Sequence, residues 1–150
     1  MRPRFLLPSL TVLMLVVALG VTACSSEETA SPAETGAAMD ATWQTVDVQT
    51  AYEALSSNAD AQIVDVREPV EWAETGVPEG AALIPLGDLE SAGASELATD
   101  QPVYVICRTG NRSQTGSDIL VGLGFSQVYN VDGGITAWLD AGQPVETYAP

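Results

Sequence analysis

One short segment combines a cysteine, two arginines and a glycine in a spacing that suits nucleophilic chemistry. It follows an apolar run at 102–106 and reads Cys107-Arg108-Thr109-Gly110-Asn111-Arg112. The thiolate is the reactive form of cysteine, so the surroundings must stabilise a negative charge. Backbone N–H groups of a tight loop can converge on an anion, and arginines add fixed positive charge. The segment therefore predicts a nucleophilic Cys107 beside an anionic ligand or an anionic intermediate.

The composition excludes two common forms of nucleophilic catalysis. The chain has no His and no Lys, so neither a Cys–His couple nor a Schiff base can form. Five arginines face 20 Asp and Glu residues, which gives a net charge of −15. Such an acidic surface repels nucleic acid, so we expect no nucleic-acid partner. We also expect no cofactor and no bound metal.

Strand-like and helix-like stretches alternate along the chain upstream and downstream of this segment. Short runs rich in Val and Ile predict strands at 61–66, 81–84, 102–106 and 127–131. Helix-like patterns occur at 48–55, 86–98, 113–123 and 135–141. Asp47 is the expected N-cap of the first, and Gly124 is expected to end the third. This alternation predicts an α/β fold, a doubly wound parallel sheet with helices on both faces. Ligands of such folds bind beyond the carboxyl ends of the strands, where Cys107 stands.

The N-terminal part indicates export and anchoring. Two arginines precede an uncharged apolar run at 5–21, and Val-Thr-Ala-Cys at 21–24 resembles the lipobox of bacterial lipoproteins. We expect residues 1–23 to be a cleaved signal peptide, with Cys24 lipidated and 24–42 a flexible linker to a domain at 43–150. The alternative is a transmembrane helix, for which the run is short. The domain would then lie on the extracytoplasmic side of the cell membrane, attached only through the lipid.

Four stretches of the chain resemble motifs of the single-domain rhodaneses, in matching order. Cys-Arg-Thr-Gly-Asn-Arg-Ser from residue 107 resembles their active-site loop. The stretch at 63–68 resembles the early strand of these proteins and the loop that follows it. The stretch at 76–86 resembles their Gly-His-Ile-Pro-Gly-Ala motif and the Ile-Pro after it. The stretch at 131–138 resembles the Gly-Gly-x-x-x-Trp motif near the end of their domain. Two departures stand in the second of these: the usual histidine is missing, and Glu79 looks inserted beside Pro78.

The resemblance implies a rhodanese-like fold and a sulfurtransferase. Cys107 would take sulfane sulfur from a small anionic donor such as thiosulfate, carry it as a persulfide, and pass it to cyanide or a thiol. Loop amides at 108–112 would hold the persulfide, and Arg108 and Arg112 would bind the sulfonate end of the donor. The remaining expected site residues support the structure: Asp65, Arg67, Gly133 and Gly134.

Two other functions stay open at this point. A phosphatase or arsenate reductase of the same fold uses five residues between cysteine and arginine, whereas four separate Cys107 from Arg112. The second alternative is not an enzyme. An anchored domain of this kind could carry sulfur to one partner, sense oxidants through Cys107, or bind another exported protein.

Overall fold

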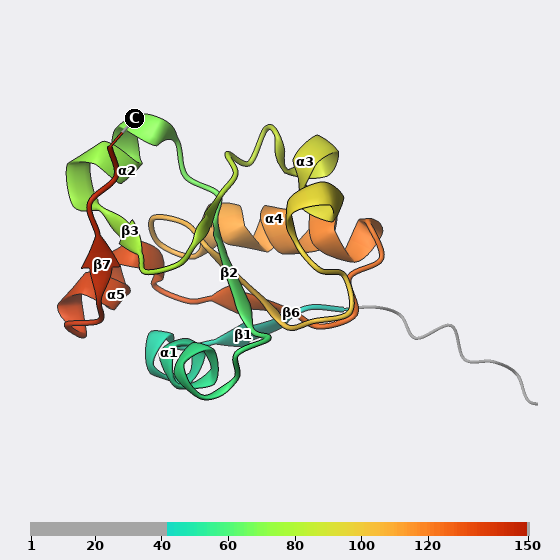
Figure 1. Ribbon diagram of the computed structural model, residues 1–150, viewed down its shortest axis with the longest axis horizontal. Helices are drawn as coiled ribbons and strands as arrows, with labels where there is room; N and C mark the ends of the chain where they lie inside the picture. Colours follow the sequence, from blue (N-terminus) through green and yellow to red (C-terminus); the bar gives the residue numbers. More distant parts are fainter. Residues whose placement is uncertain (1–41, 150) are drawn as a thin grey trace, which may run out of the picture. The chain divides into compact units, whose positions relative to one another are not determined.

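The computed structural model describes residues 42–149, which form one α/β unit (Figure 1). Five strands form a parallel sheet in the order β1-β6-β5-β2-β4. They are β1 (Gln44–Val46), β2 (Gln62–Asp65), β4 (Ala82–Leu83), β5 (Val103–Ile106) and β6 (Val128–Val131). The helices are α1 (Val48–Ser57), α2 (Pro69–Thr75), α3 (Leu89–Glu96), α4 (Asn111–Gly122) and α5 (Gly134–Asp140). The predicted α/β class and parallel sheet are confirmed.

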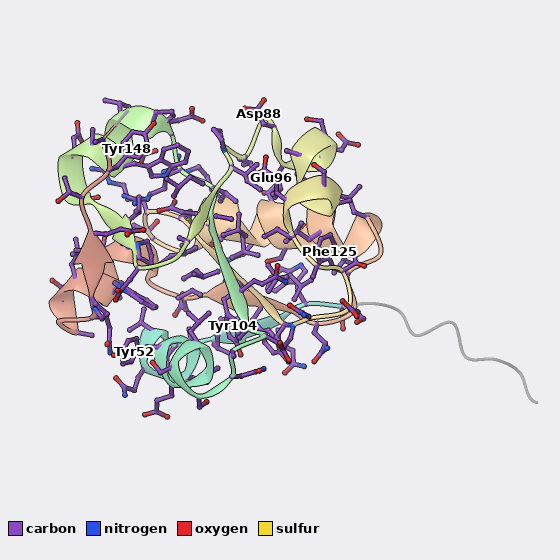
Figure 2. All side chains as sticks on the ribbon, viewed as in Figure 1. Tyr52, Asp88, Glu96, Tyr104, Phe125 and Tyr148 are labelled. Carbon is purple, nitrogen blue, oxygen red and sulfur yellow. The ribbon has the colours of Figure 1, made fainter. Side chains whose placement is uncertain are left out.

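Both faces of the sheet are covered, which explains the continuous apolar sequence of its central strand. All four residues of β5 are buried. Val103 and Val105 belong to a core cluster with Leu89 of α3 and Leu120 of α4. The alternate residues of β5 belong to a second cluster with residues of α1 and α5. Figure 2 shows Phe125 in the first cluster and Tyr104 across the sheet in the second.

Local signals set two of the helix ends as the sequence predicts. The Asp47 carboxylate accepts the backbone N–H of Thr50 at 2.7 Å, so Asp47 is the N-cap of α1. Gly124 follows the last turn of α4 with φ of 93°, the left-handed conformation that ends many helices. The predicted helix at 86–98 shortens to α3, and the strands also lose one or two residues at their ends.

Four elements were not predicted, and one of them borders the cysteine loop. These are β1, α2 and the antiparallel pair formed by β3 (Val77–Pro78) and β7 (Val145–Glu146). Helix α2 has Pro69 at its first position and a capping box between Glu68 and Glu71. Its seven residues are too few to show a clear helical period. Within residues 42–149, no helix is long and apolar enough to cross a membrane.

Candidate active site

Cys107 directly follows β5 and begins the loop that leads into α4. The residue is 1% exposed, and polar groups of the loop and of α4 lie beside its sulfur. Cys107 Sγ accepts the backbone N–H of Gly110 at 3.2 Å, and the Ser113 hydroxyl lies 3.4 Å away. The buried cysteine is thus surrounded by hydrogen-bond donors at the carboxyl end of the sheet, where the parallel fold predicts a site.

These donors favour the anionic form of the sulfur. Burial raises the pKa of the Cys107 thiol, because a charge loses solvation inside the protein. Hydrogen bonds from the Ser113 hydroxyl and from the N–H groups of Ser113, Thr109 and Gly110 act in the opposite direction. They outweigh burial, so the pKa lies below the ordinary value of 9.0. The geometry therefore activates a thiolate without a histidine.

The conformation of the loop depends on glycine. Gly110 is the N-cap of α4 with φ of 96°, and a Cβ there would lie 3.2 Å from the backbone nitrogen of Gly133. Gly134 has φ of 57°, and a Cβ there would lie 2.6 Å from the carbonyl carbon of Arg108. Only glycine accommodates such a left-handed backbone together with so close an approach. The glycine pair at 133–134 thus lets the start of α5 pack directly against the backbone of the cysteine loop.

The first turn of α5 donates hydrogen bonds to the backbone of the cysteine loop. The backbone N–H of Ile135 donates to the carbonyl of Cys107 at 2.8 Å. The N–H and hydroxyl of Thr136 both donate to the carbonyl of Arg108, at 3.2 and 3.0 Å. These are N–H groups that a helix leaves without internal partners. The two backbone carbonyls that flank Arg108 are therefore fixed.

The two loop arginines lie in different environments. Both terminal nitrogens of Arg112 donate to the Glu71 carboxylate, each at 2.7 Å. Arg112 lowers the pKa of Glu71 to about 2, and Glu71 raises the pKa of Arg112. Arg108 is exposed, and no acid of residues 42–149 forms an ion pair with it. Sulfonate binding by Arg112 stays a prediction, but its terminal nitrogens already hold a carboxylate.

Asp65 and Arg67 form a buried ion pair at the end of β2, with an N–O distance of 2.6 Å. Arg67 also donates to the hydroxyl of Thr75 at 2.7 Å and to the carbonyl of Gly76 at 2.8 Å. The pair is therefore fully hydrogen-bonded, as a buried charge must be. It ties β2 to the C-terminal end of α2, the helix that carries Glu71. A structural role for Asp65 and Arg67 stays a prediction, and the ion pair is the contact through which they would support the site.

A cavity of about 170 Å³ lies beside the loop. Its charged lining includes Arg108, Glu74 and Asp140, and Ile135 and Leu139 supply apolar surface. The cavity could hold a small polar molecule close to the cysteine loop. No cluster of three metal-binding side chains occurs in the part of the chain that the structure describes.

Three residues at the site received no role from the sequence. They are Glu71, which holds Arg112, Ser113, which faces the sulfur, and Asn130, whose carboxamide oxygen lies 2.6 Å from the Ser113 hydroxyl. A signal for Asn130 was present, because it interrupts the apolar strand Val-Tyr-Asn-Val. No pattern could have paired Glu71 with Arg112, since they are 41 positions apart in the sequence.

Comparison with known proteins identifies the family of this chain. The rhodanese-like domain family matches residues 37–141. A sulfurtransferase of Allochromatium vinosum is 33% identical over 100 residues, which cover 67% of this chain and 92% of that protein. The thiosulfate sulfurtransferase GlpE of Vibrio cholerae is 35% identical over 101 residues, with the same coverage of 67% and 92%.

A solved structure has a similar fold. The polysulfide-sulfur transferase homodimer of Wolinella succinogenes has a TM-score of 0.63 and 32% identity, covering 71% of this chain and 80% of that one. The chain belongs to the rhodanese-like domain family. Its similarity to proteins named as sulfurtransferases supports sulfurtransferase activity in general.

Proposed function

We propose that this protein is a sulfurtransferase that moves sulfane sulfur from thiosulfate or a similar donor to cyanide or a thiol through a persulfide on Cys107. One observation carries the proposal: the sulfur of Cys107 accepts hydrogen bonds from a loop whose amides and Ser113 favour its anionic form. A persulfide is anionic as well, so the same donors would hold it.

The reaction consists of two displacements at sulfur. The Cys107 thiolate attacks the outer sulfur of thiosulfate, a new S–S bond forms, and the S–S bond of the donor breaks to release sulfite. The acceptor, cyanide or a thiolate, then attacks the terminal sulfur of the persulfide. Thiocyanate or an acceptor persulfide leaves, and the Cys107 thiolate is restored. No proton transfer to the leaving group is needed, which fits a site without histidine.

The loop and its charges fit this chemistry better than the alternatives. Four residues separate Cys107 from Arg112, so the loop is short for a phosphoryl group. Arg108 is exposed beside the cavity and offers positive charge to the sulfonate end of a donor. A sensor of oxidants would use the same low-pKa thiol, and turnover with a small sulfur donor distinguishes the enzyme from it.

Steady-state kinetics with thiosulfate and cyanide test the proposal. We expect thiocyanate formation with parallel double-reciprocal plots, because sulfite leaves before cyanide reacts. Cys107→Ser should abolish turnover, and Gly122→Ala, at the opposite end of α4 from the cysteine loop, is a control that should keep it. Turnover that survives in Cys107→Ser, or no turnover with any donor and acceptor pair, would contradict the proposal.

The location of the domain is a second part of the proposal. Cys24 would carry two acyl chains, and the linker at 24–42 would hold the domain outside the cytoplasm, on the cell membrane. Residues 1–41 lie outside the described part of the structure, so this rests on the sequence pattern at 2–24. The membrane contact would be the lipid alone, since the acidic domain repels anionic headgroups.

A further inference from the structure

Asn130 is a polar residue in a place that suits an apolar one. It lies within β6, between Thr45 of β1 and Val105 of β5, and it is 0% exposed. Val128, two residues earlier, belongs to the apolar core. A buried carboxamide costs free energy unless its polar atoms are paired. The carboxamide oxygen lies 2.6 Å from Ser113 Oγ, but the carboxamide nitrogen has no hydrogen-bond partner.

Ser113 stands between Asn130 and the cysteine. Its hydroxyl oxygen lies 2.6 Å from Asn130 Oδ1 and 3.4 Å from Cys107 Sγ. A hydroxyl has one proton, so it can donate to only one of these two acceptors at a time. A neutral thiol is a weak acceptor, and the carboxamide oxygen then receives the proton. An anionic sulfur is a much stronger acceptor, because charge-assisted hydrogen bonds are roughly twice as strong as neutral ones.

Donation to the sulfur leaves the Ser113 oxygen able to accept. The carboxamide of Asn130 presents its nitrogen in place of its oxygen after a half-turn about its terminal torsion. That half-turn gives the N–H₂ group a hydrogen bond to Ser113 in exchange for the one that the carboxamide oxygen held. The resulting chain runs from Asn130 to Ser113 to the sulfur, and each bond in it polarises the next.

We propose that Asn130 is a positioning residue, which directs the hydroxyl proton of Ser113 to the Cys107 sulfur when that sulfur is anionic. It acts through Ser113 and does not touch the reacting atoms. The charged group whose field reaches Cys107 is Arg112, which is itself paired with Glu71. The inference rests on the proposed function only in treating Cys107 as the nucleophile.

The pH dependence of alkylation by iodoacetamide measures the thiolate without any sulfur donor. Asn130→Leu removes the carboxamide while keeping a similar side-chain volume. We expect the alkylation rate near neutral pH to fall about three- to tenfold, with the midpoint of the pH profile raised. In the Ser113→Ala background, which itself raises the midpoint, the same substitution should have almost no further effect.

This design separates a positioning role from a structural one. Asn130→Leu also removes a buried polar group, so the melting temperature should stay constant or rise while the thiol reactivity falls. Equal effects of Asn130→Leu with and without Ser113 would overturn the proposal. Because no sulfur donor is present, a chain that fails to transfer sulfur but shows this coupling would contradict the proposed function and leave the role of Asn130 standing.

NMR spectroscopy gives a second readout on the unaltered side chains. The amide ¹⁵N and ¹H signals of the Asn130 side chain should shift with the same midpoint as Cys107 ionisation, because the carboxamide changes from acceptor to donor. In Cys107→Ala the shift should be absent. Side-chain signals of Asn130 that stay constant while Cys107 ionises would overturn the proposal, whatever the variants do.

Discussion

Glu71 and Arg112 join α2 to the first turn of α4 through two hydrogen bonds of 2.7 Å. Arg112 is the last residue of the cysteine loop before Ser113, so this ion pair fixes one end of the loop. The other end is fixed by α5, which donates to the carbonyls of Cys107 and Arg108. Helix α2 is itself tied to β2 through the buried Arg67. The site therefore depends on a chain of contacts that begins well outside the loop.

The first prediction concerns the Glu71–Arg112 ion pair. Glu71→Gln keeps the size of the side chain but removes its charge, and we expect a loss of about 1–2 kcal/mol in the free energy of unfolding at pH 7. The Glu71 carboxylate has a folded pKa of about 2, below its ordinary 4.5. Its stabilisation is thus complete above pH 4.5 and disappears as the pH falls towards 2.

Chemical denaturation of both chains at several pH values checks this prediction. The difference in stability between the unaltered chain and Glu71→Gln should be largest near neutrality and shrink between pH 4.5 and pH 2. Glu74→Gln, on the same helix, is the matched control, because Glu74 forms no ion pair within residues 42–149. A difference that does not depend on pH would contradict the role given to the ion pair.

Arg108 and Glu74 give the second prediction, since both line the cavity beside the loop with opposite charges. Arg108→Gln should raise KM for thiosulfate several-fold with a smaller change in kcat, because a positive charge that attracts the dianion is lost. Glu74→Gln should lower KM. Added salt should reduce both effects by screening. Changes of KM in the same direction for the two variants would show that the cavity charges do not guide the donor.

The third prediction concerns the contact between Gly134 and the cysteine loop. Gly134→Ala places a Cβ against the carbonyl group of Arg108 in a left-handed conformation, so we expect a loss of at least about 2 kcal/mol of stability and most of the activity. Gly122→Ala is the matched control. A Cβ there meets no atom within 4 Å, and the helix should gain about 0.5–1 kcal/mol. Full activity in Gly134→Ala would show that the loop tolerates displacement.

The fourth prediction concerns Cys24. A full-length chain expressed in a bacterium should incorporate labelled fatty acid and partition into the detergent phase. Cys24→Ala should lose the label, and a chain of residues 25–150, which lacks both the lipid and the apolar run at 5–21, should leave the membrane fraction. Label that persists in Cys24→Ala, or a full-length chain that stays in the cytoplasm, would contradict the anchoring proposal.

The sequence predicted the parts of the fold that have strong local signals. The apolar run ending at Ile106 and the helix ended by Gly124 were both visible, because burial on two faces and a left-handed C-cap leave clear patterns. Short edge elements such as β1 and α2 leave none. The cysteine loop is contiguous, so its residues could be assigned together. Glu71 and Asn130 reach it only through the tertiary fold, from other elements of the sheet and its helices.

The most direct test of the central claim is the intact mass of residues 25–150 before and after incubation with thiosulfate alone. With no acceptor present, the reaction should stop at the persulfide, and the mass should rise by one sulfur atom. Cyanide should then remove that sulfur and restore the original mass, and Cys107→Ser should show no change. An unaltered mass after thiosulfate, or an adduct that Cys107→Ser retains, would contradict sulfur transfer through Cys107.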